Sequence, residues 1–556
     1  MPSTLDRRFD DMLARVIGPG GRLVIDHDSR GQAIVANFPA TLPEFFRIFC
    51  MLNGAVEAVV SGTERLTFAD LNRWSDQLAP VLVRRGIAKG DRVAIAMRNC
   101  PAWIVVYMAA LKAGAIATLI NGWWQSHELD QVLRLTEPVM ILADAPRAAR
   151  IAAIGGDWPL VSLDIDAPLA EALAPLLAEH QSDAVELPLI TPDDHATILF
   201  TSGSTGAAKG ALSTHRAVTT GTYAYATGLM TLFGLLTEEG RPPANPPRTL
   251  VSVPLFHVTG EIPVLLNSFV IGRGMVLMPR WDAAEALRLI EAEKITYFVG
   301  VPTMSLELMN HPDRDKYDLH TLTDLAAGGA ARPVSHVERL KLAFPAAQPA
   351  LGYGLTETNA VGCSNFWSNY AEKPASTGRP HKPFVELAIL GANDAHLCAN
   401  QRGEIAIRSA ANIHGYWRNP DATAEAFTAD HFLRTGDIGY LDDDGYLFIV
   451  DRKKDIIIRG GENISSMEVE AACYACPAVA EAAVFAAPDE RLGEIPVAVI
   501  RVREDSNLDE AELRAFLHTR LAAFKIPARM IFSAEPLPRL GTGKIDRVSL
   551  KERYAH

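Results

Sequence analysis

The stretch Ala196-Thr-Ile-Leu-Phe-Thr-Ser-Gly-Ser-Thr-Gly-Ala-Ala-Lys-Gly210 joins an apolar run to a loop of glycine and hydroxyl residues. The apolar run predicts a buried strand that breaks into a loop directly after Phe200. Successive backbone N–H groups in this loop can turn toward one anion, because Gly203 and Gly206 tolerate angles that a side chain would forbid. Hydroxyl donors and a mobile positive charge complete the loop, from Ser202, Ser204, Thr205 and Lys209. The expected guest is a polyphosphate.

This loop is not a Walker A motif, because it lacks the four-residue spacing before Gly-Lys-Ser/Thr. The usual P-loop nucleotide chemistry is therefore excluded. The loop alone is only moderately specific for one class of enzyme, so other motifs of the chain are needed to identify the chemistry.

Length and composition limit the classes of protein. A chain of 556 residues is too long for one core, so two or more domains are expected. With 53 Lys and Arg against 66 Asp and Glu, the net charge of −13 argues against nucleic acid or an anionic membrane as a general partner. The longest apolar run, 102–120, contains Lys112 and predicts a buried helix-turn-strand, not a transmembrane segment.

Cysteine usage and the N-terminus indicate the compartment. Six scattered cysteines are too few for a disulfide framework in a chain of this length. The pair Cys473 and Cys476 is interpreted as two small apolar residues on a helix that ends at Pro477, because a lone CxxC lacks a second ligand pair. Residues 1–18 have no apolar secretory core. We therefore expect a reducing cytoplasm.

Helical and strand patterns alternate from Leu66 onward, which predicts an α/β fold with mostly parallel strands. Residues 1–60 predict an irregular extension with one or two helices, and 238–248 predicts an exposed loop. The predicted helices are 68–85 and 103–113, and the predicted strands are 92–97, 139–143, 196–200, 250–253, 275–278 and 297–300.

A second, smaller domain is predicted at the C-terminus. A β-hairpin arm at 445–450 is followed by the charged run Asp451-Arg-Lys-Lys-Asp455. We place an N-terminal domain at 1–450, a hinge at 451–455 and a mobile C-terminal α+β domain at 456–556. The last is predicted to hold a strand, Gly460-Gly461, a helix and two strand–helix units.

Four further motifs accompany the glycine-rich loop, in a fixed order: Leu351-Gly-Tyr-Gly-Leu-Thr-Glu-Thr358, Arg434-Thr-Gly-Asp437, Asp451-Arg452 and Gly541-Thr-Gly-Lys-Ile-Asp-Arg547. Together they resemble the adenylate-forming superfamily: acyl-CoA synthetases, aryl-CoA ligases, beetle luciferases and peptide synthetase adenylation domains. The resemblance runs from about Leu66 to Arg547. It implies a multi-layer N-terminal domain, with two sheets packed with helices and a small β-barrel-like part, and the small mobile domain.

The resemblance implies an AMP-forming acid–thiol ligase that uses ATP, Mg²⁺ and CoA. A carboxylic acid would be activated as acyl-AMP with release of pyrophosphate, and the acyl group would then pass to the CoA thiol. The attacking oxygen and the α-phosphate are both negative, so positive groups must neutralise charge before they meet. Lys544 would bridge the carboxylate and the α-phosphate.

The same resemblance assigns the nucleotide site. The loop residues Thr201, Ser202, Gly203, Ser204, Thr205, Gly206 and Lys209 would hold the β- and γ-phosphates. Glu357 would hold Mg²⁺ with Thr205, and Thr356 would lie close to the phosphates. Tyr353 and Gly354 would contact the nucleotide, with Tyr353 against the adenine and Asp437 accepting from the ribose hydroxyls. The base would be lined by Gly329, Ala330 and Ala331, and Arg452 would contact the ribose or phosphate.

For the second step, the small domain would rotate about Lys454, withdraw Lys544 and present Gly460 and Gly461 to a pantetheine arm. His257 would line the junction of the acyl pocket and the thiol tunnel, with a core histidine as the alternative.

The acid itself is less defined by the sequence. By analogy the pocket walls come from 258–263, 326–330 and 360–364, whose small residues favour a medium- or long-chain fatty acid or a bulky ring acid. Glu261 would face solvent, cap a helix or contact a polar group of the substrate. Trp123 and Trp124 would be core or border the pocket, and core is favoured.

Rival functions are a stand-alone adenylation enzyme that loads a carrier protein, an acyl-AMP ligase that does not use CoA, and an inactive scaffold that binds nucleotide or lipid. No extra segment stands out between Arg408 and Asp451, which disfavours the acyl-AMP ligase, and Lys544, Glu357 and Asp437 together disfavour the scaffold. The expected partners are small molecules, and the resemblance also allows a homodimer.

Overall fold

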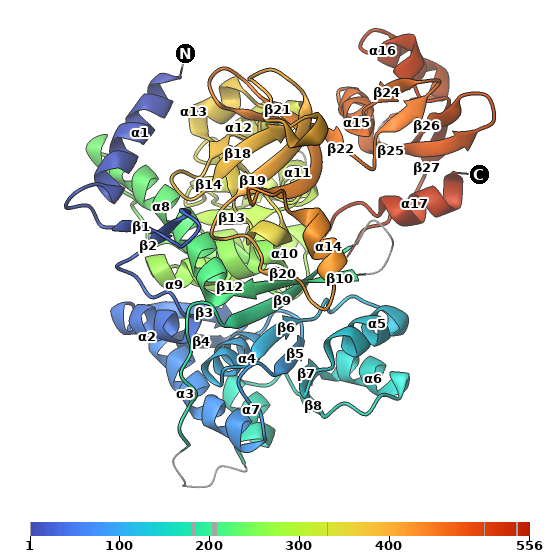
Figure 1. Cartoon of the computed structure of the whole chain (residues 1–556). Coiled ribbons are helices and arrows are strands. Elements are labelled where there is room, and N and C mark those ends of the chain that lie inside the picture. Colours follow the sequence, from blue (N-terminus) through green and yellow to red (C-terminus); the bar gives the residue numbers. More distant parts are fainter. Residues whose placement is uncertain are drawn as a thin grey trace.

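Two large sheets form the body of the molecule, and a small C-terminal domain lies at its upper right (Figure 1). The computed structural model describes residues 2–178, 185–202, 208–330, 332–504, 506–540 and 543–555. Within these residues no helix is both long and apolar enough to cross a membrane.

The first sheet has seven strands in the order β20-β10-β9-β6-β5-β7-β8, and its centre from β9 to β8 is parallel. Central strands such as β6 and β7 are buried along their whole length, as expected where helices cover both faces. Its strands are β5 (Arg92–Ala96), β6 (Ile116–Leu119), β7 (Met140–Asp144), β8 (Leu160–Leu163), β9 (His195–Ser202), β10 (Ala208–Thr214) and β20 (Gly415–Tyr416).

The second sheet has nine strands in the order β17-β16-β15-β14-β13-β11-β12-β3-β4, parallel from β15 to β3. Its strands are β3 (Glu57–Ser61), β4 (Glu64–Thr67), β11 (Arg248–Val251), β12 (Gly274–Leu277), β13 (Tyr297–Gly300), β14 (Asp324–Ala327), β15 (Gln348–Gly354), β16 (Gly362–Phe366) and β17 (Arg379–Pro380).

Helices cover both sheets. Those of the first part are α1 (Thr4–Ile17), α2 (Leu42–Leu52), α3 (Phe68–Arg84), α4 (Pro101–Lys112), α5 (Ser126–Thr136), α6 (Ala145–Ile154) and α7 (Leu169–Leu177). Those that follow are α8 (His215–Glu238), α9 (Asn267–Ile271), α10 (Ala283–Ala292), α11 (Pro302–Asn310), α12 (Val334–Ala343), α13 (Trp367–Glu372) and α14 (Pro420–Ala426).

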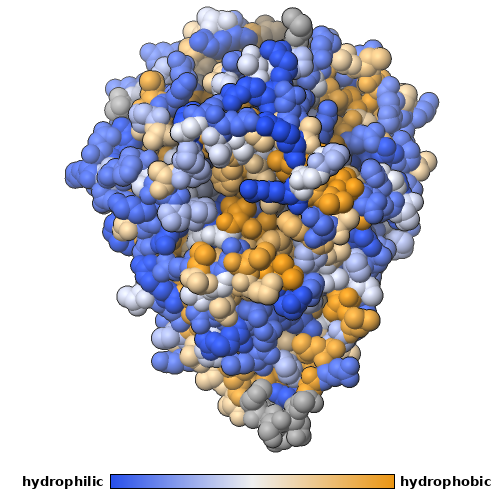
Figure 2. Space-filling view, turned by 90° about the vertical axis from the view of Figure 1, so that its left-hand side faces the viewer, coloured by the Kyte–Doolittle hydropathy of each residue, from blue (hydrophilic) through white to orange (hydrophobic). Residues whose placement is uncertain are grey.

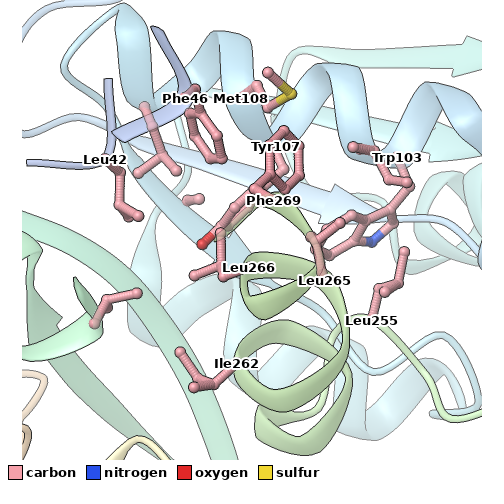
Figure 3. Packing of buried hydrophobic residues seen from close by; sticks show 14 of the residues in the cluster. Leu42, Phe46, Trp103, Tyr107, Met108, Leu255, Ile262, Leu265, Leu266 and Phe269 are labelled. Atoms are coloured by element: carbon pink, nitrogen blue, oxygen red, sulfur yellow. The ribbon is translucent and has the colours of Figure 1, made fainter. Parts of the chain in front are cut away.

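The main core lies around α4, whose twelve residues are all buried. Trp103 and Tyr107 stack on each other there and pack beside Leu265 and Phe269, which come from the other half of the domain (Figure 3). Lys112, the last residue of α4, is also buried. Its ammonium group donates to Asp76, Ser75 and Asn72, because a buried charge needs such partners.

The remaining strands form two smaller sheets. The first, in the order β18-β19-β21-β22, is antiparallel and contains β18 (Glu386–Leu390), β19 (Gly403–Arg408), β21 (Leu433–Leu441) and β22 (Leu447–Arg452). The second contains β23 (Ile457–Arg459), β24 (Glu462–Ile464), β25 (Val479–Asp489), β26 (Gly493–Val502) and β27 (Arg529–Ser533), covered by α15 (Ser466–Tyr474), α16 (Glu510–His518) and α17 (Arg547–Tyr554).

The second small sheet has hydrophobic cores of its own. Cys473 and Cys476 are buried in one of them as free thiols, which agrees with their interpretation as small apolar residues. The predicted order of strand–helix units is wrong at one point, because β25 and β26 follow each other directly as an antiparallel pair. The reason is the short connection before Gly493, whose φ of 78° suits a tight turn between strands.

The N-terminal segment is also more regular than predicted. Besides the two helices α1 and α2 it contains the hairpin β1 (Ile25–His27) and β2 (Ala33–Val35). Phe45 and Phe46 of α2 are fully buried in the main core. The segment is therefore an integral part of the N-terminal domain.

Candidate active site

One large cavity, about 3020 Å³ in volume, brings most of the predicted site residues together. It lies where β13, β14 and β15 end, between α8 and the C-terminal domain. The predicted residues that line it are Thr201, Lys209, His257, Gly329, Ala330, Tyr353, Gly354, Thr356, Glu357, Asp437, Arg452, Lys454 and Lys544.

Other predicted residues are elsewhere or cannot be placed. Gly203, Ser204, Thr205, Gly206 and Ala331, and the side chain of Ser202, lie outside the described residues. Gly460 and Gly461 are exposed and do not line the cavity. Both have positive φ and join β23 to β24 as a two-residue hairpin turn, which by itself accounts for two glycines there.

A tyrosine and an arginine hold Asp437 at one wall of the cavity. The Tyr353 hydroxyl donates to Asp437 Oδ2 over 2.7 Å, and Arg452 Nε lies 3.3 Å from Oδ1. Asp437 is 5% exposed, and this burial raises its pKa against the opposing effect of Arg452. The arrangement holds one carboxylate in place at the cavity wall, where a carboxylate can accept hydrogen bonds from hydroxyl groups.

A second group links the glycine-rich loop to Glu357. Tyr416 of β20 donates its hydroxyl to Glu357 Oε1 over 2.9 Å, and its ring lies 5.0 Å from Lys209 Nζ. The pKa of Tyr416 is raised by burial and by the neighbouring carboxylate. Glu357, Lys209 and Tyr416 all line the cavity, so Tyr416 contacts both a carboxylate and an ammonium group there. A carboxylate of this kind fits Mg²⁺, which is usually held by one or two carboxylates plus phosphate oxygens.

The turn that carries Lys544 is inserted into the cavity from the C-terminal domain. A Cβ atom on Gly329 would lie 3.1 Å from Lys544 Cε, so the lysine side chain passes directly over that glycine. The carbonyl of Gly543 accepts from Arg539 over 3.2 Å and from Thr303 of α11 over 3.5 Å. Burial and Arg452 lower the pKa of Lys544 to about 8, while Asp437 opposes the shift.

His257 lies half-buried at the cavity wall beside this lysine. Burial and the charge of Lys544 lower the pKa of His257 to about 3, so its imidazole is neutral at physiological pH. Its Nδ1 accepts from the backbone N–H of Thr259 over 3.3 Å. It lines the cavity and is not enclosed in the core, which favours the pocket over the core alternative.

The cavity continues as an apolar channel between α8 and the second sheet. Leu229, Leu232, Phe233 and Leu236 follow helical spacing along α8 and line the channel. The opposite wall is formed by residues of β13 to β16, including Val299, Ala326, Ala350, Gly352 and Ser364. Small side chains on the sheet leave the space open.

Two predicted pocket residues are placed differently. Glu261 is fully buried in a π-helical turn, 260–266, behind the wall, where Tyr107 donates to Oε1 over 2.6 Å. Burial raises its pKa to about 7. It does not line the cavity, and none of its predicted environments is the one observed. The core interpretation of Trp123 is wrong, since the residue is 41% exposed and lines the cavity, while Trp124 both packs against the core and lines the cavity.

Comparison with known proteins places this site in a family. The model of the AMP-binding enzyme family matches residues 50–417, and that of the AMP-binding enzyme C-terminal domain matches 468–544. The chain belongs to the AMP-binding enzyme family. The predicted resemblance to the adenylate-forming superfamily and the predicted α/β fold with a small C-terminal domain are confirmed.

Individual relatives of this family member cover most of its length. It is 34% identical to the long-chain-fatty-acid–CoA ligase of Bacillus subtilis (strain 168), over 88% of this chain and 90% of that one. It is 32% identical to the 3-[(3aS,4S,7aS)-7a-methyl-1,5-dioxo-octahydro-1H-inden-4-yl]propanoyl:CoA ligase of Rhodococcus jostii (strain RHA1), over 92% and 99%. The crystal structure of ATP-bound MatB from Rhodopseudomonas palustris is 28% identical and matches with a TM-score of 0.81, over 93% and 99%.

Two residues of this site were missed by sequence reasoning. Tyr416 lies in a Gly-Tyr-Trp stretch that resembles a family signature, but its partner Glu357 is 59 residues earlier, so no local pattern joins them. Arg539 pairs with Glu481 of its own domain and lies 3.6 Å from Glu307 of α11. The only signal for Arg539 is its closeness in sequence to Lys544.

Proposed function

We propose that this protein is an ATP-dependent acyl-CoA ligase for a large apolar carboxylic acid. The observation that carries the proposal is the position of Lys544 over Gly329, at the point where the Tyr353–Asp437 pair and the apolar channel meet. The predictions of an AMP-forming acid–thiol ligase and of ATP, Mg²⁺ and CoA as its cofactors are confirmed by the family and by relatives named as CoA ligases.

In the first step the residues of the cavity bind and orient the two reactants. Asp437 accepts from the ribose hydroxyls and Tyr353 lies against the adenine. Lys209 and the glycine-rich loop would bind the phosphates, and Glu357 would hold Mg²⁺, which would supply Lewis-acid stabilisation of the phosphate charge. Lys544 brings its ammonium group to the carboxylate and the α-phosphate, where negative charge develops as they react.

In the second step the C-terminal domain turns about Lys454, which lies exposed in the turn directly after β22. Among the described residues, two contacts join the Lys544 turn and its flank to α11: Arg539 with Glu307, and Thr303 with the Gly543 carbonyl. Exposed ion pairs contribute at most about 1 kcal/mol each, so the pair of Arg539 and Glu307 is a weak barrier to rotation. Withdrawal of Lys544 would open the path for the CoA thiol past His257.

The channel favours a long or bulky acid. From Gly354 to Gln348 the lining strand β15 descends six residues, or roughly 20 Å. The hydrocarbon core of a bilayer, two acyl chains deep, is about 30 Å thick, so one chain spans about 15 Å. The channel is therefore long enough for a long-chain acyl group. The Bacillus subtilis relative is named for long-chain fatty acids, and the Rhodococcus jostii relative for a fused-ring propanoic acid.

A cytoplasmic location and a homodimer remain predictions. Loading of a carrier protein and acyl-AMP formation without CoA are the rival outcomes. The experiment that separates them measures pyrophosphate release with acetate, octanoate, palmitate and a fused-ring propanoic acid, each with and without CoA. We expect release with the large acids, and an acyl-CoA product when CoA is present. Acid-dependent release without any thioester would favour a rival acceptor, and no release with any acid would contradict the proposal.

A further inference from the structure

The N-terminal helix α1 lies outside both segments that match the family models, yet it borders the same cavity. Leu5, Phe9 and Leu13 follow each other at intervals of four residues, so they form one stripe on the helix. All three line the cavity, with Leu13 buried and the other two half-buried. The stripe is therefore turned toward the channel described above.

The helix meets both walls of the channel. The Phe9 ring lies 5.2 Å from that of Phe366 at the end of β16, which itself lines the cavity. On the other side α1 packs against α8 so closely that a Cβ on Gly234 would come within 2.6 Å of Met12 Sδ. Figure 2, which faces this side of the molecule, shows apolar residues gathered in the middle of the face, bordered by hydrophilic ones. Thus α1 spans from the sheet wall to the α8 wall.

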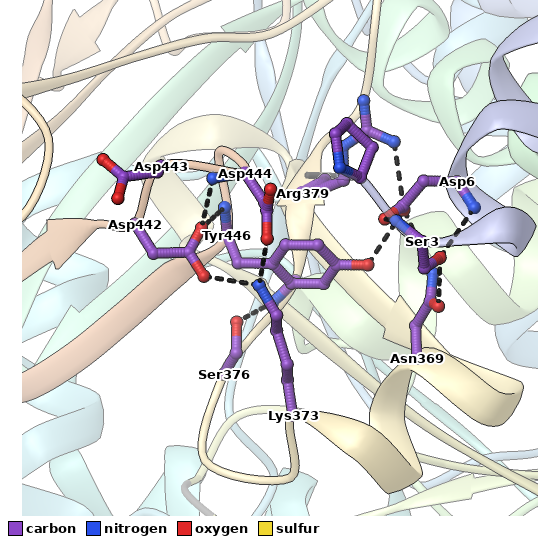
Figure 4. A network of polar contacts seen from close by, with 12 residues as sticks. Ser3, Asp6, Asn369, Lys373, Ser376, Arg379, Asp442, Asp443, Asp444 and Tyr446 are labelled. Atoms are coloured by element: carbon purple, nitrogen blue, oxygen red, sulfur yellow. Dashed lines mark hydrogen bonds and ion pairs between the residues drawn. The ribbon is translucent and has the colours of Figure 1, made fainter.

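A buried carboxylate fixes the start of α1. Asp6 is 3% exposed and caps its own helix with Ser3. It accepts from Asn369 over 3.0 Å, from Arg379 over 3.0 Å and from Tyr446 over 2.9 Å (Figure 4). These partners come from α13, β17 and the turn before β22, so α1 is bound to three separate segments of the domain.

Ion pairs hold α1 to β17 and to the end of α8. Arg379 also reaches Asp10 over 2.8 Å. Arg8 pairs with Glu239 over 2.7 Å, and Arg15 pairs with Glu238, both at the end of α8. Because both ends of α1 are bound, its apolar stripe is a fixed wall and not a loose tail.

We infer that α1 is the end wall of the acyl channel, and that Phe9 limits how long or bulky an acid the enzyme accepts. This inference rests on the proposed function. An acyl chain that follows the α8 stripe past Leu232 and Leu236 meets the Phe9 ring at the far end. Phe9 packs on Phe366 whereas Lys544 passes over Gly329, so replacing Phe9 should change the choice of acid more than the chemistry.

The test compares kcat/KM over a series of straight-chain acids from octanoate upward and a fused-ring acid. Phe9→Ala should raise the ratio of kcat/KM for the longest or bulkiest acid over octanoate by about tenfold or more, the scale at which a pocket discriminates by methylene groups. Phe9→Trp should lower the same ratio. The matched control is Arg7→Ala, on the exposed face of the same helix, which should leave the ratio unchanged.

Two measurements keep the inference separate from protein stability and from the proposed function. An unchanged ratio of kcat/KM for the long acid over octanoate in Phe9→Ala would overturn the inference, even if the variant has a lower melting temperature than the wild type. Binding of cis-parinarate, a fluorescent long-chain acid, needs no catalysis, and Phe9→Ala should tighten it relative to octanoate competition. If the wild-type protein activates no acid, the proposed function fails, and the binding measurement still decides on the wall.

Discussion

Replacing Tyr416 by phenylalanine tests whether the residue positions Glu357 for its metal. The substitution removes the hydroxyl that donates to Glu357 Oε1 over 2.9 Å and keeps the ring beside Lys209. A hydrogen bond to a charged group contributes about 1.5–3 kcal/mol, and the half-buried position of Tyr416 favours the lower end. About 1.5 kcal/mol corresponds to roughly a tenfold change.

The assay is acid-dependent pyrophosphate release as Mg²⁺ is titrated. We expect Tyr416→Phe to lower kcat/KM for ATP about tenfold at limiting Mg²⁺, to raise the Mg²⁺ concentration for half-saturation, and to leave KM for the acid unchanged. Tyr416→Ala also loses the cation–π contact with Lys209, which contributes about 0.5–1 kcal/mol. It should therefore lower kcat/KM for ATP by up to about a further fivefold, and added Mg²⁺ should not restore this part of the loss.

The matched control is Tyr440→Phe, whose ring stacks on Phe448 and is not among the residues that line the cavity. It should behave as wild type. A Tyr416→Phe protein with wild-type Mg²⁺ dependence would refute the argument that the hydroxyl orients Glu357.

Three further predictions follow from buried charges. Asp6→Ala should lower the free energy of unfolding, measured in urea, by about 3 kcal/mol, because it leaves the buried groups that donate to Asp6 without their acceptor. Asp10→Ala should lower it by under about 1 kcal/mol, and equal losses in the two variants would contradict this reasoning. Lys544 has a pKa of about 8 in the free protein and loses its charge as pH rises through that value, so kcat/KM for ATP in pyrophosphate release should fall there, and a flat profile would contradict the assignment. The folded-state pKa of Glu261, about 7, exceeds its usual value of 4.5. Its stabilising contribution is therefore complete below pH 4.5 and is lost as pH rises through 7. Glu261→Gln should remove this loss in urea titrations at successive pH values, and an unchanged pH dependence of the free energy of unfolding would count against it.

Local patterns predicted several strands of both large sheets but missed others, such as β8, β14 and β16. The predicted strand at 297–300 coincides with β13, and the predicted helix at 68–85 differs from α3 by one residue. Apolar periodicity and turn residues act over a few positions, so they can be seen in a single sequence. The family resemblance, carried by the ordered motifs, likewise predicted one site for Tyr353, Asp437 and Lys544, and all three line the same cavity.

Contacts between distant segments could not be predicted in this way. Asp6 binds partners 363 to 440 residues later, and a lone aspartate near the N-terminus carries no sign of them. Glu261 is similar, since its burial depends on Tyr107 from α4, 154 residues earlier. Such polar groups are placed by tertiary packing, which overrides their usual preference for the surface.

The central claim is that one lysine, carried by the C-terminal domain, serves the first half-reaction and is absent from the second. The most direct measurement takes Lys544→Ala and follows both halves on the same preparation: pyrophosphate release from acid and ATP, and thioester formation from supplied acyl-AMP and CoA. We predict that the first rate falls by orders of magnitude while the second stays near that of the wild type. An equal loss in both half-reactions would contradict the account.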